Sequence, residues 1–178
     1  MATRTPPLEI HYRTLTHRWG KAALAGDDRG LIALALVGGR TGLLKLLATH
    51  KIPCRKLIKT IEQHPHLGPA ASWLDALLNK GRYHAPAIQI ASPSGTLFQM
   101  KIWRAVLKIP PGETRTYAQI ARTIGHPRAA RAAGAANARN PLPLFIPCHR
   151  LVGSDGGLKN YAGGIAMKRW LLEIEKPL

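Results

Sequence analysis

Near the start of the chain, apolar and polar residues follow the short-period pattern of β-strands. Ile10–Thr16 alternates between the two classes, Ala22–Ala25 is a run of small residues, and Gly30–Val37 is an apolar run that follows two aspartates and an arginine. Short alternating or apolar runs bounded by turn residues are typical of strands. The pattern predicts three strands joined by tight turns.

The next two apolar patterns have the period of an α-helix. Thr41–His50 carries four leucines on one face, and Thr41 is the expected N-cap. Leu67–Asn79 carries a second stripe of Trp73 and three leucines, with Gly81 as the expected stop. We interpret both stripes as faces that pack into a core.

A connection then separates two parts of the chain. Tyr83–Ser94 contains prolines at positions 86 and 93 and is expected to hold only a short strand, Ala87–Ile90. We therefore predict an α+β protein with a small α/β domain over residues 1–91, connecting segment included, and a mainly helical domain over residues 92–178.

Three helices are predicted in the second part. Thr96 can cap the first, which ends before Pro110 and whose apolar face is Phe98, Ile102, Val106 and Ile109. The second is Thr116–Ile124, closed by Gly125, and the third is Arg128–Ala138, opened by Pro127.

The third of these helices consists almost wholly of alanine, glycine and arginine. Its small side chains bury little area, but they allow its backbone to approach another surface closely. Because Arg128, Arg131 and Arg139 project from it, that surface could be DNA, and with the preceding helices the arrangement is similar to helix-turn-helix. The alternative is a helix packed tightly on its neighbour with its arginines in solvent.

The composition excludes several classes of protein. At 178 residues and 46% apolar content the chain can bury a core, and its two cysteines, Cys54 and Cys148, give no disulfide framework. No apolar run is long enough to span a membrane, and Met1–Pro7 has no apolar signal core. We expect no membrane association and a reducing, cytoplasmic location.

The formal net charge is +17, which predicts attraction to a polyanion, with nucleic acid as the default partner. The charge is divided almost evenly, +8 over residues 1–94 and +9 over residues 95–178, so it does not say which part binds. Basic side chains that are merely solvated are the alternative.

Cys148 is the main candidate for chemistry. An apolar run that follows Asn140 leads to Pro147, Cys148, His149 and Arg150. A neighbouring histidine or cation lowers the pKa of a thiol and populates the nucleophilic thiolate. Cys148 is therefore predicted to be reactive, the alternative being a small apolar residue at the end of a buried strand. Cys54 lacks metal-ligand spacing and is interpreted as incidental.

The ordered motifs from Gly95 to Glu175 resemble the O6-alkylguanine-DNA alkyltransferases. They are Tyr117, the helix over residues 127–140, Pro-Cys-His-Arg at 147–150, Asn-Tyr-Ala-Gly-Gly at 160–164 and the closing helix Lys168–Glu175. The resemblance implies a ribonuclease-H-like first domain, a winged-helix or helix-turn-helix-like second domain, and suicidal transfer of an alkyl group from guanine O6 to Cys148. It implies no cofactor and no metal.

The resemblance also implies roles for individual residues. His149 would act as base through a bound water, and Glu175 would orient the imidazole, although Glu173 is also near. Asn140 would brace the active-site segment. Arg131 would enter the base stack, Tyr117 would turn the damaged nucleotide, Tyr161 would form a pocket wall, and the carbonyls of Cys148 and Leu151 would accept from guanine. The remaining DNA contacts would come from Thr116, Arg128, Ala130, Gly134 and Ala138.

Two positions depart from the family pattern. Ala162 stands where relatives often carry serine, so its amide can still face O6 but a hydroxyl is lost. Asn137 stands where some relatives carry methionine, which affects the alkyl groups that fit. The expected partner is duplex DNA that carries O6-alkylguanine, and the protein is expected to be a monomer. Activity on O4-alkylthymine and cooperativity on DNA stay open. A sensor without alkyl transfer and a helix-turn-helix regulator are the alternatives; Cys148 argues against the first.

Overall fold

The computed structural model describes residues 9–60, 64–84, 88–91 and 94–176, which fold into two compact units. One unit comprises residues 1–79 and 86–94, and the other comprises residues 80–85 and 95–178. The predicted domain boundary between residues 91 and 92 stays a prediction. The α+β class that the sequence predicts is confirmed.

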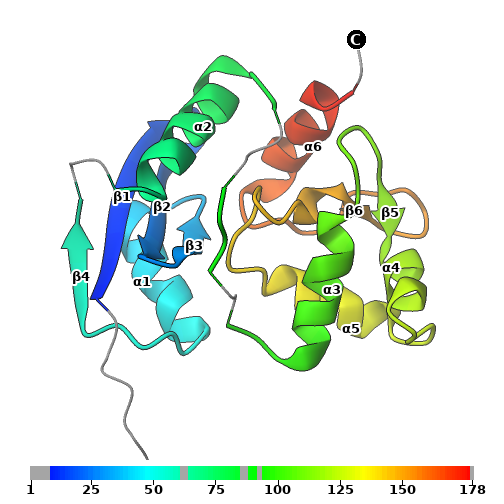
Figure 1. The fold of residues 1–178 in the computed structure, drawn as a ribbon. Helices are drawn as coiled ribbons and strands as arrows, with labels where there is room; N and C mark the ends of the chain where they lie inside the picture. Colours follow the sequence, from blue (N-terminus) through cyan, green and yellow to red (C-terminus); the bar gives the residue numbers. More distant parts are fainter. Residues whose placement is uncertain (1–8, 61–63, 85–87, 92–93, 177–178) are drawn as a thin grey trace, which may run out of the picture. The chain divides into compact units, whose positions relative to one another are not determined.

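The N-terminal unit is built on a four-stranded sheet of order β3-β2-β1-β4. Its strands are β1 (Glu9–His17), β2 (Gly20–Asp27), β3 (Gly30–Ala35) and β4 (Lys56–Lys59), and its helices are α1 (Gly39–Thr49) and α2 (Leu67–Lys80) (Figure 1). The first three strands are an antiparallel meander, as predicted. Strand β4, which no sequence pattern indicated, pairs in parallel with β1.

Both faces of this sheet are covered. Ile10 and Tyr12 of β1 pack with Leu43 and Leu47 of α1 in one buried cluster. On the opposite face Leu67 of α2 lies against the backbone of β2, within 3.4 Å of where a Cβ on Gly26 would stand. Strand β3 is accordingly buried at every position.

Two local predictions in this unit concern the N-cap of α1 and the strand at Ala87–Ile90. Thr41 is not the N-cap of α1, because the helix begins at Gly39 and its N-cap is Gly38, which has φ 81° and no side-chain cap. The chain leaves β3 through this left-handed turn, which favours glycine. Of the strand expected at Ala87–Ile90, residue 87 lies outside the described residues, and Ile90 forms a single bridge to Leu31.

The C-terminal unit is mainly helical. It contains α3 (Leu97–Leu107), β5 (Arg115–Thr116), α4 (Tyr117–Thr123), α5 (Ala130–Ala138), a 3₁₀ turn η1 (Cys148–Arg150), β6 (Leu151–Val152) and α6 (Gly164–Ile174). Thr96 and Thr116 cap α3 and α4, each in a capping box with a glutamine three residues later. Strands β5 and β6 pair in parallel.

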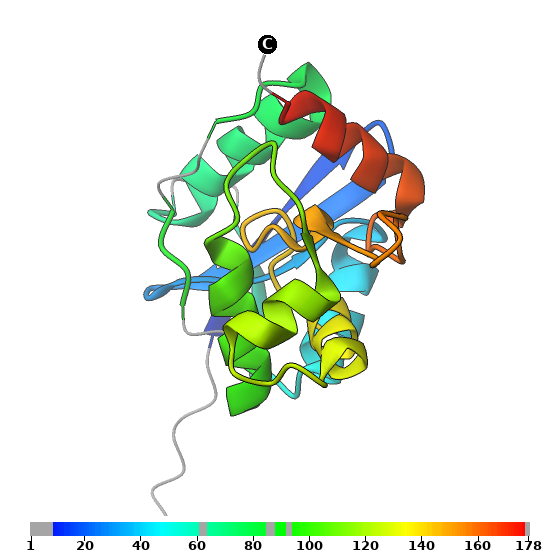
Figure 2. The ribbon, with the colours of Figure 1, turned by 90° about the vertical axis from the view of Figure 1, so that its right-hand side faces the viewer.

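Helices α4 and α5 lie side by side in both views and form the predicted helix-turn-helix-like arrangement (Figures 1 and 2). Helix α5 begins at Ala130, two residues later than expected, so that Arg128 lies in the preceding turn. The indole of Trp103 on α3 donates a 3.0 Å hydrogen bond to the carbonyl of Ala136. The small residues of α5 therefore do allow close packing on a neighbour along one face.

Among the described residues, no helix combines the length and apolar character needed to cross a membrane.

Candidate active site

Cys148 sits in a short helical turn at the end of a buried segment. Residues 148–150 form the 3₁₀ turn η1, so Cys148 does not end a strand. Asn140 holds the preceding segment: its amide donates to the carbonyl of Ile146 at 2.8 Å, and its side-chain oxygen accepts from the amide of Leu142 at 3.0 Å. All three residues are buried. The Asn140 side chain thus fixes the path of the backbone into Cys148.

The thiol of Cys148 is 5% exposed and is not poised as a thiolate. Burial raises its pKa from 9.0 to about 11, although a hydrogen bond with Asn140 and the charge of Lys168 act in the opposite direction. The thiol pKa is therefore raised and not lowered as predicted, because burial outweighs the neighbouring groups. A base that removes the thiol proton is needed for nucleophilic chemistry at this site.

His149, Glu175 and Arg150 form a buried network beside the thiol. Nε2 of His149 lies 2.9 Å from Oε1 of Glu175, while Arg150 donates to both carboxylate oxygens at 2.8 Å. Burial raises the pKa of Glu175, but the hydrogen bonds from His149 and Arg150 outweigh it, so that the pKa falls to about 2. Glu175 is therefore an anion over the whole physiological range.

This network fixes the protonation of the imidazole. An ionised carboxylate only accepts hydrogen bonds, so the Nε2 atom of His149 carries the proton and Nδ1 presents a lone pair. The pKa of His149 is lowered, with burial as the largest cause, although the hydrogen bond and the charge of Glu175 act in the opposite direction. Within the described part of the chain, Nδ1 is buried and has no hydrogen-bond partner. His149 is accordingly a neutral base with a free lone pair.

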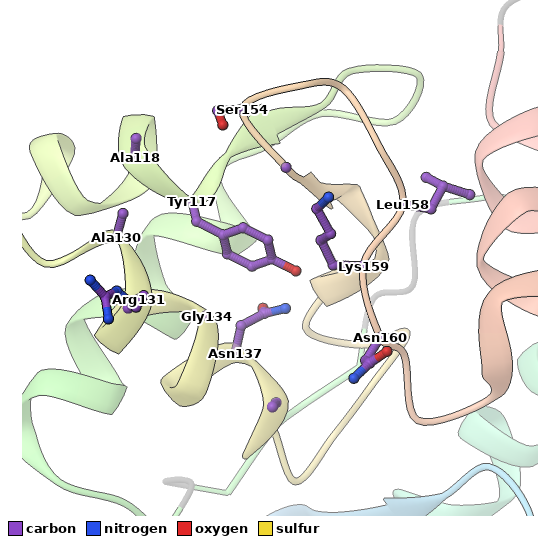
Figure 3. Close-up of a pocket in the computed structure, with 12 residues that line it drawn as sticks. Tyr117, Ala118, Ala130, Arg131, Gly134, Asn137, Ser154, Leu158, Lys159 and Asn160 are labelled. Carbon is purple, nitrogen blue, oxygen red and sulfur yellow. The ribbon is translucent and has the colours of Figure 1, made fainter.

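A pocket of about 620 Å³ lies between α4, α5 and the loop after β6 (Figure 3). Tyr117 extends across it from the start of α4, and Asn137 points from α5 toward the hydroxyl end of Tyr117. Lys159 enters from the opposite loop. The lining residues are Tyr117, Ala118, Ala130, Arg131, Gly134, Asn137, Ala138, Gly153, Ser154, Leu158, Lys159 and Asn160.

The predicted substrate residues gather near Cys148. Burial raises the pKa of both Tyr117 and Tyr161, and a negative charge on Cys148 raises each further, which requires both phenols to be close to the thiol. Tyr161 also packs edge-on against His149 with ring centroids 6.2 Å apart. Asn137 donates to the carbonyl of Cys148 at 3.3 Å. Ala162 follows Tyr161 and is exposed.

The Leu151 carbonyl, expected to accept from a guanine, already accepts from Lys168 Nζ at 2.6 Å. Because a carbonyl oxygen has two lone pairs, one position remains for a ligand.

The predicted DNA-binding residues fall into two groups. Ala130, Arg131, Gly134 and Ala138 line the pocket along α5, and Arg131 is exposed at its edge. Arg128 is exposed in the turn before α5. Thr116 instead caps α4, because its hydroxyl accepts from the amide of Gln119 at 3.1 Å.

Sequence reasoning missed three residues of the network. Arg150 and Lys168 were named only as members of sequence motifs and were given no role of their own, yet they are 4% and 0% exposed. Tyr83 accepts a hydrogen bond from Arg150 at 2.7 Å and was interpreted only as part of a connection. For Arg150 a signal existed, its place in the Pro-Cys-His-Arg motif; Tyr83 carried none. In the residues described, no three His, Cys, Asp or Glu side chains are placed to bind a metal ion.

Comparison with known proteins identifies the family. Residues 97–177 match the DNA binding domain of 6-O-methylguanine DNA methyltransferase. A methylated-DNA–protein-cysteine methyltransferase of Methanosarcina barkeri is 40% identical over 94% of this chain and 98% of that protein. Its counterpart in Mycobacterium leprae is 39% identical over 94% of this chain and 93% of that protein.

Solved structures agree with these sequence matches. The crystal structure of Mycobacterium tuberculosis O6-methylguanine methyltransferase has a TM-score of 0.73 and 36% identity, with 94% of this chain and 93% of that chain covered. The structure of Mycobacterium tuberculosis OGT in complex with DNA has a TM-score of 0.76 and 36% identity, with 93% and 92% covered. The chain therefore belongs to the methylated-DNA–protein-cysteine methyltransferase family.

Proposed function

We propose that this protein repairs DNA by direct reversal, through irreversible transfer of the alkyl group of O6-alkylguanine to Cys148. The observation that carries the assignment is the buried thiol beside a neutral His149 that Glu175 holds through Nε2. The relatives named methylated-DNA–protein-cysteine methyltransferase support the same activity.

The transfer is a displacement at the alkyl carbon. His149 takes the thiol proton on Nδ1, through a water as the family resemblance implies, and the sulfur attacks the carbon as the bond from that carbon to O6 breaks. The electron pair of that bond stays on the guanine as an anion, which takes up one proton, balancing the proton that left the thiol, and so becomes the normal base, while a thioether forms on Cys148. The network does not remove the alkyl group from Cys148 again, so each protein molecule acts once.

The guanine must leave the duplex to reach this thiol, because O6 is paired and stacked within DNA. The pocket beside α5 supports this step. Arg131 lies at its edge and would fill the space left in the stack, and Tyr117 extends across it and would hold the rotated nucleotide. The small residues of α5 suit the narrow minor groove. The carbonyls of Cys148 and Leu151 and the amide of Ala162 would then orient the base.

The partner is double-stranded DNA, consistent with the DNA complex of a relative. We infer that the protein acts as a monomer in the cytoplasm. Activity on O4-alkylthymine and cooperative binding are further properties to be measured with the same assay.

The assignment is tested by intact-protein mass spectrometry with peptide mapping after incubation with a duplex that carries one O6-methylguanine. One methyl group on Cys148, and no more than one per protein molecule, is the expected result. Cys148→Ala is expected to bind the duplex without any gain of mass. Binding by the native protein with unchanged mass would contradict the proposal and identify a non-enzymatic sensor.

A further inference from the structure

Tyr83 joins the catalytic network from outside the matched domain. Its hydroxyl accepts a hydrogen bond from Nη2 of Arg150 at 2.7 Å, and the guanidinium carbon lies 5.7 Å from the centroid of its ring. Residues 80–85 belong by their contacts to the C-terminal unit, although the family domain match begins only at residue 97. The connection between the units therefore supplies a side chain to the site.

The guanidinium of Arg150 is held from three directions. Its Nε donates to Oε2 of Glu175 at 2.8 Å, and its Nη1 donates to the carbonyl of Ile109 at 2.5 Å. Its Nη2 uses one hydrogen for Oε1 of Glu175 at 2.8 Å and the other for Tyr83. Because the guanidinium is planar, these contacts fix its rotation as well as its position.

Arg150 and His149 share one acceptor. Both Nη2 of Arg150 and Nε2 of His149 approach Oε1 of Glu175, at 2.8 and 2.9 Å. The position of Arg150 therefore decides how strongly this oxygen acts on the imidazole. A group that holds Arg150 in place acts on His149 without touching it.

We propose that Tyr83 is a positioning residue for alkyl transfer, holding Arg150 against Glu175 so that the shared carboxylate keeps His149 oriented with Nδ1 available to the thiol. This inference rests on the proposed function and adds to it a residue that acts through Arg150 alone.

The sign of its effect follows from the groups around His149. The charged groups that act on the imidazole are Glu175, Arg150 and Lys168, and the Tyr161 ring packs against it. After burial, Glu175 raises and Arg150 lowers the pKa of His149. Loosening Arg150 lets Glu175 act more strongly, so the pKa of His149 rises. In the pH profile of the transfer rate, the fall in rate on the acid side then moves to higher pH.

The test is Tyr83→Phe, which keeps the ring over Arg150 and removes only the hydroxyl. The single-turnover rate of methyl transfer is measured with saturating O6-methylguanine duplex as a function of pH. We expect a rate about tenfold lower at neutral pH, as for loss of a hydrogen bond to a charged group, together with the shifted acid limb. Affinity for the duplex is expected to stay unchanged.

Tyr12→Phe is the matched control, since it removes a hydroxyl from a buried tyrosine in the N-terminal sheet. Its rate profile is expected to coincide with that of the native protein. A structural role for Tyr83 would lower thermal stability but leave the pH profile in place.

A double-mutant cycle tests the route through Arg150. Arg150→Lys keeps the charge but loses the planar fork, and adding Tyr83→Phe to it is expected to cause no further loss. Additive losses, or a Tyr83→Phe profile that superimposes on the native one, would overturn the inference. If the native protein itself transfers no methyl group, the proposed function fails instead, and the two failures are distinguishable.

Discussion

At the scale of single residues, the state of the Cys148 thiol depends on burial by residues far along the chain. Arg150 and Lys168 are buried beside it in sequence or in space, and hydrogen bonds to Glu175 and to the Leu151 carbonyl compensate the loss of water around their charges. The adjacent residues Pro147, Cys148 and His149 predicted the reacting group, but not these contacts. A local pattern carries no record of such contacts.

Burial of the Cys148 thiol makes stability depend on pH at the alkaline side. The pKa of the thiol is about 11 when folded, against an ordinary 9.0 that applies to the unfolded chain, so its contribution is complete below pH 9.0 and is lost as pH rises through about 11. We expect the native protein to lose about 1–3 kcal/mol more than Cys148→Ala across this window. Urea denaturation at several pH values measures this difference, since titration of the lysines cancels in the comparison. Parallel curves for the two proteins would contradict it.

Arg131 has a role that is predicted to matter only in duplex DNA. If it fills the stack after the damaged guanine rotates out, Arg131→Ala should slow repair of an O6-methylguanine duplex by about ten- to a hundredfold, as for a base-flipping cost of a few kcal/mol. Reaction with a free O6-alkylguanine base, which needs no rotation, should change little. Arg104→Ala on the exposed face of α3 is the control. Equal losses on both substrates would contradict the role of Arg131.

At the scale of elements, the sequence predicted most of the helices and strands because their apolar periods and caps are local. Thr96 and Thr116 cap their helices as capping boxes require. Strand β4 was missed because Lys56–Lys59 is only four residues long and is held by β1, which lies far away in sequence. The start of α1 was misplaced because a left-handed glycine turn, not a hydroxyl, begins the helix.

Helix α5 carries one glycine, Gly134, among residues that mostly favour a helix. Gly134 lies inside the helix and lines the pocket, and a Cβ there would meet the Tyr117 ring at 3.7 and 3.8 Å, which is ordinary contact. Gly134→Ala is therefore expected to stabilise the protein by about 0.5–1 kcal/mol through helix propensity. It should also slow duplex repair, because the methyl group narrows the pocket beside Tyr117.

Thermal denaturation and single-turnover repair measured on the same sample separate the two effects of Gly134→Ala. Ala132→Gly provides the reverse change at an exposed position of α5 that does not line the pocket. It should destabilise by a similar amount and leave the repair rate as it is. A Gly134→Ala protein that repairs duplex DNA at the native rate would show that the base does not occupy this part of the pocket.

At the scale of the whole molecule, charge and composition predicted a polyanionic partner but not where it binds, because the two parts of the chain are almost equally basic. The structure narrows the choice of surface that could bind this partner. Arg131 and Lys159 line the pocket, and Arg128 is exposed in the turn before α5, so cations lie both in the pocket wall and at the start of the helix that lines it.

The salt dependence of DNA affinity can therefore locate the interface. Each phosphate that a cation neutralises releases counterions and contributes about −0.9 to the slope of log K against log salt concentration. Arg128→Ala is expected to make this slope shallower by about one unit and to weaken binding to damaged and undamaged duplexes alike. Lys45→Ala removes the same charge from the exposed face of α1 and should leave the slope unchanged. Fluorescence anisotropy across a salt series measures the affinity and the slope for each variant. An equal change of slope in the two variants would mean that DNA binding depends on the net charge of the molecule and not on the cations around α5.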